Sequence, residues 1–350
     1  MSRILAVDVG AGTQDILLFD SDKTIENCVK LVLPSQTTIV AQRIRQATQE
    51  GRDIFLTGNL MGGGPFVSAA KKHIRAGLSV YATSLAARSV RDDLREVGAM
   101  GIKIVELAPD NVVSVSTRDV DLPRLRQALA LFDVDLPERF AVAVQDHGEA
   151  PGMSQRRFRF KHWADFVKAG GDLQALAYVA DPPSYLTRMN AVLADVPGAL
   201  LMDTCAAAVV GALCDEQVAA CHDEGVVIVN VGNQHTLGVL CQNQRIWGVF
   251  EHHTACLDVN KLKLYIEMLQ EGNIDNNKIF EDNGHGAYVD PGYFLIKERT
   301  NDAFRFITVT GPNRHMARPL GYHFAAPYGD MMLSGCYGLI TAAHWRGWTV

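Results

Sequence analysis

Short apolar runs alternate with stretches of helical spacing along most of the chain, and turns of small or polar residues separate them. Residues 4–10 and 15–20 are apolar runs joined by the small-residue turn 11–14, which predicts a β-hairpin. The spacing favours helices over 37–49 and from about residue 67 onward. Further strands are predicted at residues 31–33, 53–57, 78–82, 102–105, 112–116 and 140–144.

The second half of the chain begins the same pattern again. Residues 225–230 and 237–241 are apolar runs on either side of a polar turn containing Gly232, about 220 residues after Gly10. Alternating strands and helices favour an α/β fold, and the repeated hairpin indicates an internal duplication in which each half presents one hairpin to a shared cleft. Around the second hairpin we expect strands at 199–202, 245–250 and 306–310 and helices at 203–214, 257–270 and 330–343, with a polar connection before residue 288.

Composition narrows the class of protein. Of 350 residues, 48% are hydrophobic and 21% charged, which excludes a disordered or fibrous chain, and the net charge of −6 argues against a general nucleic-acid binder. No apolar run is long enough for a membrane span, and no hydrophobic leader precedes the first strand, so we expect a cytoplasmic protein without a membrane partner. Seven cysteines without a Cys-x-x-Cys pair indicate free thiols.

The two hairpin turns are candidate phosphate sites. Backbone amides hold phosphate oxygens best in turns that lack large side chains, and Gly10, Ala11, Gly12 and Thr13 form such a turn. Asp8, at the end of the first strand, is the candidate ligand for Mg²⁺ and a candidate catalytic residue. The second turn supplies Gly232, Asn233, Gln234, His235 and Thr236. Either turn alone is also compatible with an ordinary glycine turn, and their pairing favours the phosphate interpretation.

The order of these motifs resembles the ATPase superfamily of sugar kinases, heat-shock chaperone ATPases and actin. The hairpins resemble its two phosphate motifs, residues 203–212 resemble its first connecting helix, and residues 329–340 resemble its closing helix. The resemblance implies duplicated ribonuclease H-like domains, here 1–195 with inserted elements and 196–350, around a cleft that binds ATP and Mg²⁺. It also places the adenosine motif at residues 308–314, with Gly311, Asn313 and Arg314 near the nucleoside.

A narrower resemblance rests on the segment from Asp8 to Asp20, the segment 26–34, and the later segments 251–254 and 284–286. These are similar to an uncharacterised prokaryotic family whose members are often labelled pyruvate formate-lyase activating enzymes. Radical enzymes of that kind hold an iron-sulfur cluster on three closely spaced cysteines. The nearest spacing here, Cys205 to Cys214 to Cys221, is nine and seven residues. The cysteine spacing therefore argues against the radical activity.

One position departs from the superfamily pattern. The second phosphate motif usually begins with an aspartate, and here the residue is Asn230. An amide orients water or ligand but carries no charge, so a base or metal role would pass to another residue. Asp203 and Asp15 are the nearest candidates. A proline, Pro312, follows Gly311 where paired glycines are expected, which leaves the nucleotide open.

Histidines provide further candidates. His252 and His253 end a predicted strand and should point to opposite faces, which argues against one metal ion bound by both. Either could be a general acid or base, and the alternative is a structural histidine beside the cleft. His147 at a strand end and His285 between two glycines are placed where ligands gather in α/β folds.

Two other motifs have plainer interpretations. Residues 62–65, three glycines and a proline before a helix, could bind an anion, but an ordinary loop explains them. We interpret the basic and aromatic residues 156–161 as the solvated face of a strand, with an acidic substrate or partner as the alternative.

We therefore expect a two-domain α/β protein with magnesium nucleotide in its cleft. The first hypothesis is an ATP-dependent enzyme that transfers a group to, or activates, a small molecule. The second is a nucleotide-driven activator of a partner enzyme, and the third is a hydrolase or condensing enzyme on the same scaffold that uses the histidines. The sequence leaves the substrate and the oligomeric state open.

Overall fold

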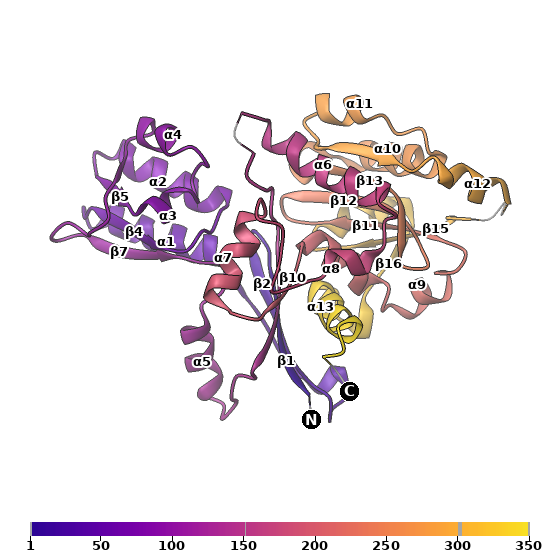
Figure 1. Ribbon diagram of the computed structural model, residues 1–350, viewed down its shortest axis with the longest axis horizontal. Helices are drawn as coiled ribbons and strands as arrows, with labels where there is room; N and C mark the ends of the chain where they lie inside the picture. The colour runs from indigo at the N-terminus through magenta and orange to yellow at the C-terminus, as the bar shows by residue number, and fades with distance from the viewer. Residues whose placement is uncertain (1, 151, 300–302, 349–350) are drawn as a thin grey trace.

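A computed structural model describes residues 2–150, 152–299 and 303–348, and Figure 1 shows their arrangement. The first sheet has the order β3-β2-β1-β8-β10-β9. Its strands are β1 (Arg3–Val9), β2 (Thr13–Asp20), β3 (Val29–Pro34), β8 (Arg139–Val144), β9 (Tyr178–Val179) and β10 (Leu200–Met202). The strands β1, β2 and β3 form an antiparallel meander, and β8 and β10 run parallel to β1.

The second sheet repeats this plan in the order β14-β13-β12-β11-β15-β16. Its strands are β11 (Val226–Val231), β12 (His235–Gln242), β13 (Arg245–His253), β14 (Gly286–Val289), β15 (Phe306–Thr310) and β16 (His323–Phe324). Again three antiparallel strands come first, and β15 and β16 run parallel to β11. Both halves thus have the ribonuclease H-like order, and the predicted duplicated α/β fold is confirmed.

A third, smaller sheet lies in a unit inserted after β3. Its parallel strands have the order β6-β5-β4-β7, and Figure 1 shows it with its helices on the left of the view, apart from the second sheet. The unit has its own apolar core, from Val40 to Val115. Its elements are α1 (Gln36–Gln49), β4 (Ile54–Gly58), α2 (Gly64–Arg75), β5 (Val80–Ala82), α3 (Ser84–Ala87), α4 (Leu94–Ala99), β6 (Ile102–Ile104) and β7 (Val113–Thr117).

Two helices of small residues pack together where the two large sheets meet. Helix α8 (Thr204–Ala212) packs against α13 (Ser334–Trp345), and α13 also packs on β1 and β8. A Cβ at Gly211 would overlap the carbonyl oxygen of Ser334, and a Cβ at Gly338 would overlap that of Ala207. Glycine at these two positions therefore lets the helix backbones come into direct contact.

The remaining helices cover the sheets. Helices α5 and α7 lie with the first sheet, α10 lies against the second, and α6 packs on β13 and β14. These helices are α5 (Leu122–Ala130), α6 (Gln155–Lys168), α7 (Thr187–Asp195), α9 (Glu216–Ala220), α10 (Val259–Glu271), α11 (Asn276–Glu281) and α12 (Gly292–Arg299). Among the described residues, no helix has both the length and the apolar character needed to cross a bilayer.

One predicted element is wrong. The basic and aromatic residues 156–161 lie in helix α6 and not on a strand. In a helix Arg159 and Phe160 come to the buried side with Trp163, while Arg157 stays exposed, and the strand interpretation missed this 3.6-residue spacing. The polar connection before residue 288 contains α11 and β14. The division at residue 195 stays a prediction; β10, which follows it, pairs with β8 of the first sheet.

Candidate functional site

The two hairpin turns face each other across a single cavity. The turn between β1 and β2 contributes Gly10, Ala11 and Thr13 to the wall, and the turn between β11 and β12 contributes residues 232–235. The turns are built alike: Gly10 N–H donates to Thr13 O at 2.9 Å, and Gly232 N–H donates to His235 O at 3.0 Å. A Cβ on Gly12 would lie 2.8 Å from Asn233 Nδ2, so the turns are in near contact.

Two buried carboxylates lie side by side at the end of the first hairpin. Asp8 and Asp15 are directly opposite each other on β1 and β2, and both line the cavity. Thr204, at the start of α8, donates its hydroxyl proton to Asp8, whereas Asp15 Oδ1 has no hydrogen-bond partner. Burial raises the pKa of Asp8 to about 7, and burial together with the charge of Asp8 raises that of Asp15 to about 8. The pair needs a proton or a cation.

The opposite wall comes from the second sheet, and Gly335 of α13 lies directly against Asp8. Asn230, the penultimate residue of β11, lines the cavity beside Gly311, whose φ of +95° and close approach to Asn230 exclude a side chain. Asn313 Nδ2 donates to Gly232 O at 3.0 Å and so fixes the second turn. Arg314 instead points to Ala325 O and the ring of Phe324, away from the cavity. Thr236 is fully buried and bonds to Thr254, behind the turn.

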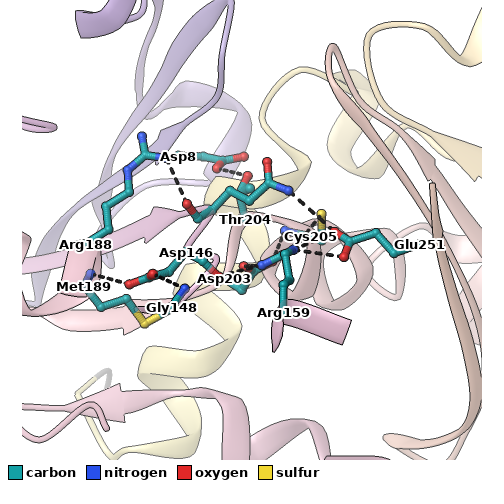
Figure 2. Close-up of polar contacts among 11 residues, drawn as sticks. Asp8, Asp146, Gly148, Arg159, Arg188, Met189, Asp203, Thr204, Cys205 and Glu251 are labelled. Atoms are coloured by element: carbon teal, nitrogen blue, oxygen red, sulfur yellow. Dashed lines mark hydrogen bonds and ion pairs between the residues drawn. The ribbon is translucent and has the colours of Figure 1, made fainter. Parts of the chain in front are cut away.

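A buried ion cluster lies beside the cavity (Figure 2). Arg159 of α6 binds Asp203 Oδ2 at 2.8 Å, and its Nη2 lies 2.7 Å from Glu251 Oε1 on β13. Arg159 also donates to the carbonyl of Asp146 at 2.8 Å. Burial alone would raise the pKa of Glu251, but the charge and hydrogen bonds of Arg159, together with His285 and His235, hold that pKa well below its usual range. Asp203 is therefore engaged as helix cap and ion partner, and it does not line the phosphate cavity.

A second, larger cavity of about 650 Å³ adjoins the first and opens toward the inserted unit. Gln145 and Gln234 line both cavities. The larger one is basic, because six cationic side chains and only two carboxylates, Asp92 and Asp146, line it. The six are Lys71, Lys72 and Arg75 of α2 with Arg88, Arg91 and Arg188. Arg88 and Arg188 are paired with Glu149 and Asp119. Residues 62–64 form part of its wall, before the first turn of α2.

Four histidines gather between the two cavities. His235 and His253 are opposite each other on β12 and β13, with ring centroids 4.9 Å apart. The ring of His285 lies 4.9 Å from that of His235, and the ring of His147 lies 5.3 Å from it. Burial lowers the pKa of His235 to about 3 and that of His285 to about 4, so both rings are neutral at pH 7. His252 points to the other face of β13, where it contacts Asp282 and Tyr265.

The structure thus brings most of the predicted residues together. Asp8, Asn230, Gly311 and most residues of both glycine turns line one cavity. The other predicted residues do not line it: Gly12, Asp203, Thr236, His252, His253, Asn313 and Arg314. Sequence reasoning missed Thr204, which follows the predicted Asp203, and Arg159, which was assigned to a solvated strand. In a helix, residue 159 shares one side with the apolar residues Phe160 and Trp163. This spacing is the sequence signal that could have placed Arg159 on the buried side.

One family profile matches most of the chain. It covers residues 61–316 and carries the description "Putative pyruvate format-lyase activating enzyme (DUF1786)". No curated protein matches the chain significantly.

Solved structures with similar topology share little sequence. The ethanolamine utilization protein EutJ from Carboxydothermus hydrogenoformans is 13% identical, with 96% of this chain and 88% of that chain covered and a TM-score of 0.34. The inorganic polyphosphate/ATP-glucomannokinase from Arthrobacter sp. strain KM is 8% identical, with 99% and 100% covered and a TM-score of 0.37. The activator of the 2-hydroxyisocaproyl-CoA dehydratase from Clostridium difficile, with bound ADPNP, is 9% identical, with 99% and 97% covered and a TM-score of 0.27.

Proposed function

The chain belongs to the DUF1786 family, and from the geometry of its two cavities we propose that it is an ATP-dependent enzyme that acts on a small anionic molecule. The observation that carries the proposal is the symmetric pair of glycine turns facing one cavity that is also lined by two adjacent buried carboxylates, Asp8 and Asp15. Backbone amides of two opposed turns suit the polyphosphate of a nucleotide, because each turn offers donors without obstructing side chains.

The carboxylates fit a magnesium ion. Mg²⁺ is bound in proteins through one or two carboxylates together with substrate phosphates, and Asp8 and Asp15 supply two adjacent carboxylates. The unpartnered Asp15 Oδ1 and the raised pKa values of both groups are what a missing cation would leave behind. Mg²⁺ would neutralise phosphate charge at this position.

The larger cavity suits the second substrate. Its excess of basic side chains favours an anion such as a carboxylate or phosphate compound. The shared residues Gln145 and Gln234 place this cavity directly beside the phosphate turns. A group transferred from the nucleotide would therefore move only from the phosphate cavity into the adjoining larger cavity.

A nucleotide-driven activator of a partner enzyme is the second candidate. The phosphate cavity measures about 90 Å³, whereas ligand pockets usually measure roughly 300–1,000 Å³. Nucleotide binding therefore requires the two halves to separate, and such a motion could be transmitted to a partner. A motion of this size is also compatible with an enzyme that closes on its substrate.

Thermal-shift titration with a non-hydrolysable ATP analogue, with and without Mg²⁺, tests the proposal. A ligand at 100 times its Kd stabilises the folded protein by about 2.7 kcal/mol, and we expect this gain only with Mg²⁺ present. Asp8→Ala should abolish it, and the matched control Asp20→Ala, at the far end of the same hairpin, should retain it.

The same titration can refute nucleotide binding, and an assay of phosphate transfer then separates the two functions. No stabilisation of the wild type, or full stabilisation of Asp8→Ala, would overturn nucleotide binding at this site. If nucleotide binds, phosphate transfer to one member of a panel of small carboxylates and phosphates supports the enzyme. Nucleotide turnover that no small molecule stimulates would favour the activator.

A further inference from the structure

Three histidine side chains from separate parts of the fold converge on one point. His147 follows β8 of the first sheet, His235 begins β12, and His285 precedes β14. One ring nitrogen of each lies within 4.8 Å of the others. Among the described residues this is the only group of at least three His, Cys, Asp or Glu side chains whose ligand atoms gather in this way.

The ring nitrogens lack the partners that a structural role would require. Both nitrogens of His235 and both of His285 are buried without a hydrogen bond. A buried polar group without a hydrogen bond destabilises the folded state, so four such atoms in one cluster would be a large penalty. Buried neutral imidazoles present lone pairs, and a shared cation would satisfy one on each ring.

Charges beneath the histidines favour a cation. The ion cluster of Arg159 with Asp203 and Glu251 carries one positive and two negative groups, and Glu251 lies on the same strand as His253. The backbone N–H of His285 also donates to the carbonyl oxygen of Glu251, at 2.8 Å, and so holds His285 beside this strand. Glu251 is the strongest charge that acts on His235 and His285, where it favours a cation, while Arg159 and, at His285, Arg156 oppose it.

We propose that His147, His235 and His285 bind one divalent transition-metal ion of the zinc class, distinct from the magnesium site at Asp8 and Asp15. Imidazole ligands suit Zn²⁺ and its neighbours in the first transition row, whereas Mg²⁺ prefers oxygen. Zn–N bonds of about 2.1 Å hold tetrahedral ligand atoms roughly 3.4 Å apart, so binding draws the rings together by up to about 1.4 Å.

Three protein ligands leave a fourth position for another group. Sites with three ligands and an open position are typical of catalytic zinc, whereas structural sites are closed. His147 lines the larger cavity, and His235 lines the phosphate cavity. The open position therefore faces the space between them, where an oxygen of an anionic substrate can bind the ion.

Cobalt titration of metal-free, untagged protein tests the site directly. Co²⁺ bound by imidazoles in four-coordinate geometry absorbs in the visible region, so we expect an absorption that saturates at one Co²⁺ per chain and that Zn²⁺ abolishes. His285→Ala and, separately, His147→Ala should weaken the affinity by at least about 100-fold. His315→Ala, which removes an exposed histidine, is the matched control and should bind as the wild type does.

Circular dichroism establishes that each variant is folded. If replacement of the buried His285 unfolds the protein, His147→Ala alone tests the histidine site. No saturable cobalt spectrum in the wild type, or unchanged affinity in a folded His147→Ala variant, would overturn the proposal. The inference does not depend on nucleotide binding. Asp8→Ala should keep the cobalt spectrum while losing the nucleotide response, so the two sites can fail independently.

Discussion

At the scale of single residues, the buried pair Asp8 and Asp15 makes stability depend on pH. Their pKa values, about 7 and about 8, lie above the ordinary value of 3.8, so the folded protein binds more protons than the unfolded chain between these limits. The free energy of unfolding therefore falls as pH rises from about 4 to about 8 in the absence of ligand.

Asp8→Asn should reverse this loss. The amide cannot ionise, so at pH 8 the ligand-free variant should be more stable than the wild type by on the order of 2 kcal/mol, with little difference at pH 4. The measurement is the melting temperature between pH 4 and pH 9. Asp20→Asn is the control, because the pKa of Asp20 is lowered by local hydrogen bonds, and its replacement should give no gain at pH 8. A wild-type melting temperature that rises steadily up to pH 8 would contradict the raised pKa values.

At the scale of elements, α8 and α13 are in direct contact where the two large sheets meet. Gly338→Ala places a methyl group against the carbonyl of Ala207, and relief requires the helices to separate. We expect a loss of about 1–3 kcal/mol in the free energy of unfolding, measured by denaturant titration.

The matched control for that substitution is Gly98→Ala in α4. A Cβ there meets nothing within 4 Å, and alanine is the better helix former, so this variant should be neutral or slightly more stable. Equal stability of the two variants would mean that α8 and α13 are not held in close contact.

Elements with a strong local pattern could be predicted from the sequence, and the two hairpins indicated the duplication. The ribonuclease H-like order of strands was expected only from the resemblance to the ATPase superfamily. The turns at Gly10 and Gly232 and their shared cavity were also accessible, because glycine and polar turn residues have a local cause. Helix α6 was not recovered, since Arg159 looks like surface until Asp203 and Glu251, 44 and 92 residues away, pair with it. The histidine cluster likewise joins strand ends that only the folded sheets bring together.

At the scale of the whole molecule, the positions of the cysteines bear on the family's description. All seven are free, and Cys205 lies at the ion cluster whereas Cys214 contacts Thr341 on α13. We predict that protein purified without oxygen contains no stoichiometric acid-labile sulfide. Sulfide is the appropriate measurement because iron alone could occupy the histidine site. About four sulfides per chain, together with the visible absorption of an iron-sulfur cluster, would instead support the radical activity that the family's description names.

The last prediction concerns the rate of nucleotide hydrolysis by the whole protein. Asn230 lines the phosphate cavity at the position where the ATPase superfamily that the sequence resembles usually has an aspartate, and an amide cannot accept the proton of an attacking water. Asp203 does not replace it, because both its oxygens bind Arg159. Asp15, the other candidate, lines the cavity but is assigned with Asp8 to Mg²⁺. We therefore expect the isolated protein to bind nucleotide but release phosphate slowly, since a positioned base commonly contributes about 10²–10⁴-fold.

Asn230→Asp should accelerate phosphate release, and Asn230→Gln, which stays neutral, should not. The anionic second substrate supplies its own oxygen as the nucleophile, so it should stimulate nucleotide turnover by the wild type, in which Asn230 is unchanged. Rapid hydrolysis by the wild type alone, lost in Asn230→Asp, would show that the neutral amide is required and that water is activated elsewhere in the cavity.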